Sequence, residues 1–261
     1  MGQSLSQDVA IVTGAGRGIG RGIALSLAAE GAAVGVLART EEEITATAAL
    51  ISDAGGRAMA VPLDVRDAAA VRAAVSETTS RFGPVTVLIN NAGTPGPSGL
   101  DWEVDPEAWF ECIEVIMRGA LLLSQAVAPG MIARRLGRII NVASIAGTRA
   151  FPRITATSIA KTALIRFSEG LAAQLDEHEV RVFAVHPGIV RTRLFESYGF
   201  QIPEERFVGP ERAGSLCTRL ASGRYDLLSG RFLDIDDNLE DLLSRAGDIT
   251  ARELYTLRLN I

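Results

Sequence analysis

A run of small residues near the start of the chain has the spacing of a phosphate-binding loop. Residues 13–20 read TGAGRGIG, directly after a short apolar run and directly before a helical pattern. Glycines let a backbone turn tightly and approach a pyrophosphate, and the N-terminus of the following helix favours its negative charge. The segment predicts a dinucleotide-binding loop; a purely structural glycine turn is the alternative. The positions concerned are Gly14, Gly16, Arg17, Gly18, Ile19 and Gly20.

Further motifs follow other predicted strands. Residues 90–93 read NNAG after the fourth strand, and residues 187 and 188 read PG after the sixth. The first loop has the spacing TGxxxGxG, because Ile19 occupies the last position of the pattern GxGxxG. In this order, over about residues 8–235, the motifs resemble those of the classical short-chain dehydrogenase/reductase family. The resemblance implies a Rossmann-type α/β fold and a nicotinamide dinucleotide cofactor.

The resemblance also implies which residues meet that cofactor. The adenine is expected near Asp64 and Val65, the ribose near Asn90, and the carboxamide near Ile189 and Thr192. The remaining expected contacts are Thr40, Ala92, Gly93, Lys161, Pro187 and Gly188.

The residues after the second strand bear on the choice of cofactor. An acidic residue there would accept the ribose hydroxyls of NAD, but residues 37–40 read LART. Arg39 and Arg17 would instead bracket a 2′-phosphate through charge-assisted hydrogen bonds. We therefore expect NADP(H), and we expect Arg39→Asp to shift the preference toward NADH.

The catalytic positions of the family are only partly retained. The resemblance assigns Ser144 to the serine that holds the substrate oxygen, and Lys161 to the lysine that lowers the pKa of a catalytic tyrosine. Thr157 stands where that tyrosine would donate a proton, and Ile116 stands where an asparagine would hold a relay water. An aliphatic hydroxyl is far less acidic than a phenol with a pKa of about 10. Losing the general acid should raise the barrier to ketone reduction by roughly 3 to 5 kcal/mol.

Several interpretations of these substitutions stay open. The favoured one is reduction of a protonated imine, which needs no proton donor because hydride transfer gives a neutral amine. In the second, a displaced group donates the proton to a carbonyl substrate: Tyr198, Ser144, or a water held by Thr157 and Lys161. In the third, the protein binds NADP without catalysis. In the fourth, Ile116 and Thr157 were introduced deliberately.

Short β-branched runs alternate with helical stretches, which is typical of βαβ units and a parallel sheet. Strands are expected near Val9–Thr13, Ala33–Leu37, Ala58–Pro62, Val85–Asn90, Arg138–Val142, Val180–His186 and Phe232–Ile235. Helices are expected near Gly18–Ala29, Glu41–Ala54, Ala68–Phe82, Pro106–Arg135, Thr155–Asp176 and Pro210–Ala221. The prediction is a seven-stranded doubly wound sheet with helices on both faces and a ligand crevice at the carboxyl ends of the strands. It forms a single domain over residues 1–261, with a variable substrate loop at 189–208 and an atypical tail at 236–261.

Composition excludes several other classes of protein. The 26 basic residues are spread along the chain and outnumbered by 31 acidic ones, so the net charge of −5 argues against a nucleic-acid partner. Cys112 and Cys217 lie far apart without paired histidines, so neither a disulfide framework nor a metal site is expected. The uncharged, largely apolar stretch of residues 119–133 is shorter than a membrane span. We expect a cytoplasmic enzyme with a small-molecule substrate and no membrane partner; Met1, Gly2 and Ser6 fit a myristoylation pattern that no second membrane signal supports.

Two surfaces are expected to need a cover. The tail carries an apolar side that would close the pocket or pack on another subunit; it consists of Leu239, Leu242, Leu243, Ile249, Leu254 and Leu257. The family is commonly tetrameric or dimeric through its long fourth and fifth helices. Alanine- and leucine-rich faces over residues 120–128 and 163–173 are consistent with a homotetramer or homodimer.

Overall fold

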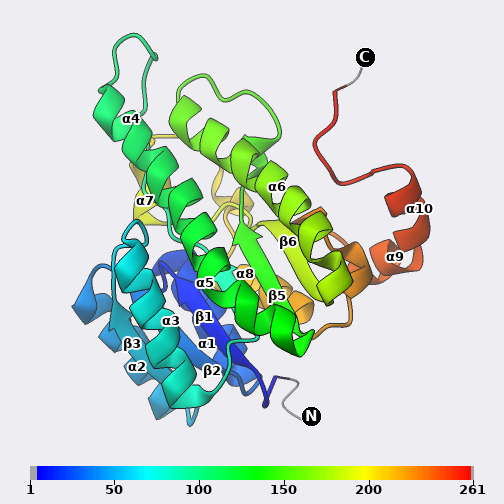
Figure 1. Ribbon diagram of the computed structural model, residues 1–261. Coiled ribbons are helices and arrows are strands. Elements are labelled where there is room, and N and C mark those ends of the chain that lie inside the picture. The colour runs from blue at the N-terminus through cyan, green and yellow to red at the C-terminus, as the bar shows by residue number, and fades with distance from the viewer. Residues whose placement is uncertain (1–4, 260–261) are drawn as a thin grey trace.

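A computed structural model describes residues 5–259 of the chain and places seven parallel strands in one sheet (Figure 1). The strands are β1 (Val9–Thr13), β2 (Ala33–Ala38), β3 (Arg57–Pro62), β4 (Val87–Asn90), β5 (Gly137–Val142), β6 (Val180–His186) and β7 (Phe232–Asp234). Their order is β3-β2-β1-β4-β5-β6-β7. The predicted doubly wound, Rossmann-type sheet is confirmed. Met1 and Gly2 of the myristoylation pattern lie outside the described residues.

The apolar runs seen in the sequence form the middle of this sheet. Every residue of β1 and of β4 is buried, as expected for strands covered on both faces. β1 pairs with β2 on one side, Ile11 opposite Gly35, and with β4 on the other, Ile11 opposite Leu88. The strand order reverses between β1 and β4, so the crevice of a doubly wound fold lies beyond the carboxyl ends of these two strands.

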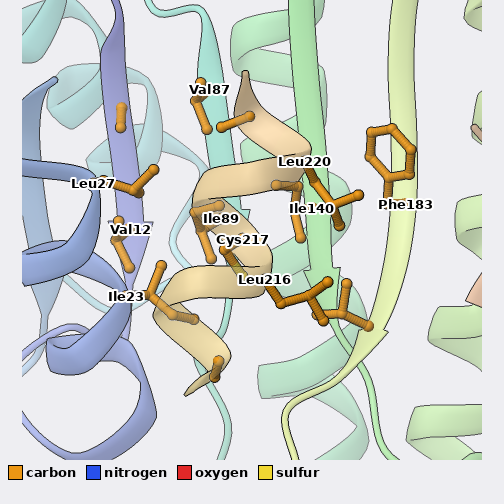
Figure 2. Packing of buried hydrophobic residues seen from close by; sticks show 14 of the residues in the cluster. Val12, Ile23, Leu27, Val87, Ile89, Ile140, Phe183, Leu216, Cys217 and Leu220 are labelled. Carbon is orange, nitrogen blue, oxygen red and sulfur yellow. The ribbon is translucent and has the colours of Figure 1, made fainter. Parts of the chain in front are cut away.

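Helices cover both faces of the sheet (Figure 1). One face carries α1 (Gly18–Ala29), α2 (Glu41–Asp53) and α8 (Pro210–Ala221). The other carries α3 (Ala68–Phe82), α5 (Gly119–Arg134) and α6 (Thr155–Leu175). Figure 2 shows the first of these layers, where α1 and α8 pack on the strands through Ile23, Leu27, Leu216, Cys217 and Leu220 against Val12, Val87, Ile89, Ile140 and Phe183.

Several helix starts follow from local sequence. Asp67 precedes α3, and its carboxylate accepts hydrogen bonds from the N–H groups of Ala69 and Ala70. Asp105 caps α4 (Pro106–Ile113) in the same way, with Pro106 in the first turn, where a missing N–H costs nothing.

The predicted continuous α-helix from Pro106 to Arg135 is corrected in its middle. α4 is followed by a π-helical segment, Glu114–Arg118, before α5 begins at Gly119. A π turn inserts one residue into the helical ladder, and such insertions are frequent at functional sites. By length and composition alone, the combined helix Pro106–Arg134 could cross a membrane; here Leu123, Val127 and Met131 of α5 pack in the core.

Most of the apolar side of the tail packs on the core of its own chain. α9 (Leu239–Ser244) and α10 (Ala246–Ala251) bury Leu239, Leu242 and Ile249 in the core cluster beside α1 and α8. Farther on, the guanidinium of Arg258 pairs with Glu169 of α6, N to O 2.7 Å. The tail therefore returns along the sheet and completes the core.

Candidate active site

The glycine-rich loop after β1 has the backbone that its sequence predicts. Gly14 and Gly18 adopt φ angles of +62° and +54°, a region that side chains with a Cβ rarely occupy. A Cβ on Gly20 would lie 2.3 Å from the carbonyl oxygen of Gly14, so the helix and the loop touch backbone to backbone. α1 begins at Gly18 and presents its first N–H groups to this loop. The cradle fits a pyrophosphate, whose close approach side chains at these positions would block.

Two residues without an assigned role in the sequence analysis hold this loop against β4. The Oγ1 of Thr13 accepts hydrogen bonds from the N–H groups of Asn91 and Ala92, both at 2.9 Å. The Asn91 amide donates in return to the carbonyl oxygen of Thr13 at 2.9 Å. Both residues lie inside the recognised motifs, so position in a motif was the available signal. They tie the loop to the neighbouring strand at the point where the strand order reverses.

The residues expected near the adenine and its ribose lie at the ends of β2 and β3. Arg39 directly follows β2, is exposed, and has no ion pair within residues 5–259. Asp64 is held by the guanidinium of Arg66, Nη2 to Oδ2 2.6 Å. This hydrogen bond lowers the pKa of Asp64, although burial acts in the opposite direction. The positive charge of Arg39 lowers the pKa of Asp64 by a smaller amount. Because Arg66 already satisfies this carboxylate, the Arg39 guanidinium beside it stays available to an anion.

Three other predicted cofactor contacts, Val65, Asn90 and Thr40, differ in their environments. Val65 is buried and packs against Gly119, the first residue of α5. The Asn90 amide donates to Asn141 Oδ1 at 2.8 Å, so this donor is engaged inside the sheet. Thr40 is the residue before α2, although its side chain makes no capping hydrogen bond.

The segment after β6 closes over the glycine loop. Gly188 has a φ of +77°, and a Cβ there would lie 2.3 Å from Cδ1 of Ile235, so only glycine fits the turn that follows Pro187. The methyl group of Thr192 lies 3.0 Å from the Cβ position of Gly18. The two ends of the predicted cofactor site, residues 14–20 and 187–192, are thus brought into contact.

Ser144 and Lys161 come together at the end of β5. Ser144 follows the strand by two residues, and its Oγ accepts a hydrogen bond from the Ala146 N–H at 3.1 Å. The Nζ of Lys161, on α6, donates to the carbonyl oxygen of Val142 at 2.6 Å. Burial lowers the pKa of the Lys161 ammonium to about 8. At neutral pH the group is still mostly protonated, so it places a positive charge at this edge of the sheet.

Thr157 lies one helical turn before Lys161 and meets a tyrosine from a distant segment. Its Oγ1 is 2.6 Å from the phenolic oxygen of Tyr198, so the two hydroxyls are hydrogen-bonded. Cys112 of α4 lies behind, with Sγ 3.5 Å from the same threonine oxygen. Burial raises the pKa of Tyr198 to about 12, although the Thr157 hydrogen bond acts in the opposite direction. The Tyr198 hydroxyl is therefore held at α6 by Thr157, one helical turn before Lys161.

Aromatic contacts within residues 189–208 position Tyr198. Its ring centroid lies 5.7 Å from that of Phe200, and Phe200 in turn lies 6.2 Å from Phe195. Phe195, in the short helix α7 (Arg193–Glu196), meets Phe207 edge-on at 5.3 Å. The predicted substrate loop, residues 189–208, is thus held together by contacts between its own aromatic rings. Its aromatic composition was the signal in the sequence for this packing.

Ile116 makes the wall beside this hydroxyl apolar. It lies in the π-helical segment and is 3% exposed. Its Cγ1 is 3.8 Å from the Cβ position of Gly93, and Cδ1 of Leu194 is 3.9 Å from the same point. The π segment, the NNAG motif and the loop therefore meet at one apolar spot. Within residues 5–259, no cluster of three or more His, Cys, Asp or Glu residues could hold a metal ion.

Comparisons with known proteins show the family of this chain. The family model for short chain dehydrogenases matches residues 8–201. The short-chain reductase protein NovJ of Streptomyces niveus is 42% identical over 77% of this chain and 76% of its own length. Oxidoreductase UcpA of Escherichia coli is 34% identical over 87% of this chain and 92% of its own length.

Solved structures of other proteins have the same fold as this chain. A single-residue variant of actinorhodin polyketide ketoreductase, solved with NADPH, superposes with a TM-score of 0.83 at 32% identity, over 92% of this chain and 99% of that one. A gluconate 5-dehydrogenase from Burkholderia cenocepacia, in complex with NADP and tartrate, has a TM-score of 0.82 at 29% identity, over 91% and 98%. The chain described here is an oxidoreductase and belongs to the short-chain dehydrogenase family.

Proposed function

We propose that this protein is an NADPH-dependent reductase of carbonyl compounds in which Tyr198 donates the proton. The observation that carries the proposal is the 2.6 Å hydrogen bond between the Tyr198 phenol and Thr157. It supports the second of the sequence-based interpretations, a displaced proton donor. The relatives support carbonyl chemistry as well, since the actinorhodin enzyme is a ketoreductase.

The cofactor assignment rests on the loop and its charges. The glycine cradle would hold the pyrophosphate, and Arg17 together with the exposed Arg39 would hold a 2′-phosphate. Two solved relatives contain NADPH or NADP. When bound, NADPH supplies the hydride that reduces the substrate.

The residues at the end of β5 and on α6 would handle the oxygen and the proton. Ser144 would orient the substrate oxygen by a hydrogen bond. Tyr198 is a neutral phenol at neutral pH, and burial, which raises its pKa to about 12, favours this protonated form further. An alkoxide binds a proton more tightly than the corresponding phenolate, so proton transfer from Tyr198 to the substrate oxygen is favourable. Thr157 fixes the phenol in place, and the Lys161 ammonium stabilises the negative charge that develops.

Imine reduction is the second candidate, and it was the one favoured by the sequence. The observation for it is that the Lys161 ammonium donates to Val142 and the phenol has a raised pKa, so the site holds only a weak acid. A protonated imine needs no acid, because hydride transfer to it gives a neutral amine. The apolar surface made by Ile116 and Leu194 would suit a bulky cyclic substrate of either kind.

The test compares consumption of NADPH with a bulky cyclic ketone and its matched cyclic imine, from mildly acidic to neutral pH. Turnover of the ketone with little turnover of the imine is the expected result. Faster turnover of the imine would overturn the proposal in favour of the second candidate. Tight NADPH binding without turnover of either compound would instead support the interpretation of a non-catalytic NADP-binding protein.

We also propose that the protein assembles as a homodimer or homotetramer in the cytoplasm. Apolar side chains lie exposed along the long helices: Phe110 of α4, Leu121 of α5 and Ile159 of α6. Such exposure on packed helices favours an interface between subunits. Light scattering after size exclusion should give a mass of two or four chains of 27.6 kDa, and a monomeric mass would contradict this proposal.

A further inference from the structure

One acidic side chain is shared by two arginines that lie far apart in the sequence. The Oε1 of Glu43 lies 2.9 Å from Nη1 of Arg17, in the glycine loop. The same oxygen lies 3.2 Å from Nη1 of Arg193, in the substrate loop. Two guanidinium groups therefore converge on one anionic oxygen.

Glu43 is held at the glycine loop by its helix. It lies in the first turn of α2, and its Cβ is 2.8 Å from the Cβ position of Gly16, so a side chain at residue 16 would displace it. One turn later, Thr47 Oγ1 hydrogen-bonds the carbonyl oxygen of Gly16 at 3.3 Å, and Arg21 donates to the same carbonyl at 3.0 Å. The Glu43 side chain is 24% exposed, so most of it is packed beside the glycine loop.

Arg193 is also held beside the loop. It follows Thr192, whose methyl group contacts Gly18 and whose hydroxyl caps α7 by accepting from the Phe195 N–H at 3.1 Å. Without an anion between them, the Arg17 and Arg193 guanidinium groups would repel one another. Two guanidinium groups around one oxygen are what a phosphate group would meet in such a site.

We propose that Arg193 is a third cationic contact of the cofactor's 2′-phosphate, and that Glu43 takes the place of this phosphate until the cofactor binds. The inference rests on the proposed use of NADP(H). A phosphate carries more negative charge than a carboxylate, so it would replace Glu43 between the arginines. Because Arg193 belongs to the loop that carries Tyr198, the 2′-phosphate would then fasten the proton donor's loop to the cofactor.

The test measures binding of 2′,5′-ADP and 5′-AMP to the full chain by isothermal titration calorimetry, without turnover. Arg193→Gln should weaken binding of 2′,5′-ADP about three- to tenfold and leave 5′-AMP unchanged. Glu43→Gln should tighten binding of 2′,5′-ADP, because the phosphate no longer displaces a charged carboxylate. Arg206→Gln is the matched control, since it removes the same charge from an exposed position of the same loop. Arg193 is 72% exposed on its side chain, so the variant is expected to fold, and a melting curve checks this.

The outcomes separate this inference from the proposed function. If the unmodified protein prefers 2′,5′-ADP and Arg193→Gln preserves that preference, the contact by Arg193 is overturned while the NADP(H) assignment stands. If Glu43→Gln weakens binding, Glu43 positions the arginines and its role as a competitor is overturned. Equal affinity of the unmodified protein for both nucleotides would overturn the NADP(H) assignment and this inference together.

Discussion

In the proposed mechanism, the side chains of Thr157 and Tyr198 together take the place of one catalytic tyrosine. A single tyrosine on the helix would carry its phenol into the site by itself, whereas Thr157 is too short and holds a phenol that arrives from another segment at 2.6 Å. Two segments must therefore be aligned, and the alignment depends on the aromatic packing of Phe200 and its neighbours.

The buried ammonium group of Lys161 makes the stability of the fold depend on pH. The pKa of Lys161 is about 8 in the folded chain, because burial disfavours the charged form. In the unfolded chain, where water surrounds the side chain, the pKa is 10.5. The unfolded chain thus binds the proton more tightly, so the contribution of Lys161 to stability rises with pH between about 8 and 10.5 and is lowest below 8. The full change is about 3 kcal/mol.

Urea unfolding of the unmodified protein and of Lys161→Met across this pH range tests the point. The difference in unfolding free energy between them should grow in favour of the unmodified protein as the pH rises from about 8 to 10.5. Other groups, such as Cys217, titrate in both proteins and cancel in the difference. A difference that does not change with pH would mean that the ammonium is not desolvated in the fold.

At the scale of elements, the loop after β1 and the helix that follows form one unit. The contact between Gly20 and the Gly14 carbonyl leaves no room for a methyl group, and Asn91 Nδ2 lies 2.5 Å from the same Cβ position. Gly170, inside α6, has open space around its Cβ position. The same substitution should therefore act in opposite directions at the two sites.

Gly20→Ala should destabilise the fold by about 1 to 3 kcal/mol and weaken binding of NADPH, because the loop must open. Gly170→Ala should stabilise it by about 0.5 to 1 kcal/mol, because alanine loses less backbone entropy in a helix. Chemical denaturation and titration of NADPH fluorescence measure both effects. Unaltered NADPH binding by Gly20→Ala would show that the loop tolerates a side chain and is no close cradle.

Particular elements show what the sequence could predict. The strands at Val9–Thr13 and Val180–His186 were predicted at the bounds observed, because buried parallel strands are continuous apolar runs. β4 begins at Val87 and not at Val85, since Thr86 turns its hydroxyl to the Val9 N–H at 3.1 Å. The π segment was not predictable, because its unusual hydrogen bonding depends on tertiary packing around Ile116.

The candidate site was predictable where motifs lie next to strands and not where distant segments meet. Motif spacing identified Gly14 to Gly20, and the chain places them as expected. Tyr198 was one of several candidate displaced donors, but no sequence pattern could select it, because its partner Thr157 is 41 positions away. The contact of Glu43 with Arg193 spans 150 positions and was missed for the same reason.

At the scale of the whole molecule, the tail contributes to the core of the domain. Leu242 of α9 is 2% exposed and lies in the same core cluster as residues of α1 and α8. Leu259, beyond the last helix, is 85% exposed. Leu242 is therefore expected to contribute more to the stability of the fold than Leu259.

Leu242→Ala should lower the free energy of unfolding by about 2 to 5 kcal/mol, through lost burial and the cavity left behind. Leu259→Ala is the matched control and should change it by less than about 0.5 kcal/mol. Thermal melts of the two variants provide the comparison. Equal melting temperatures for both variants would mean that the tail packs more loosely than its burial indicates.

The central claim is that a tyrosine from the substrate loop donates the proton in place of the residue at 157. The most direct measurement is the kcat for ketone reduction by Tyr198→Phe, which keeps the aromatic packing and removes only the hydroxyl. The account predicts a fall of about a hundredfold to ten-thousandfold, the usual contribution of a general acid, with NADPH binding unchanged. An unchanged kcat in Tyr198→Phe would contradict the account and remove Tyr198 from the mechanism.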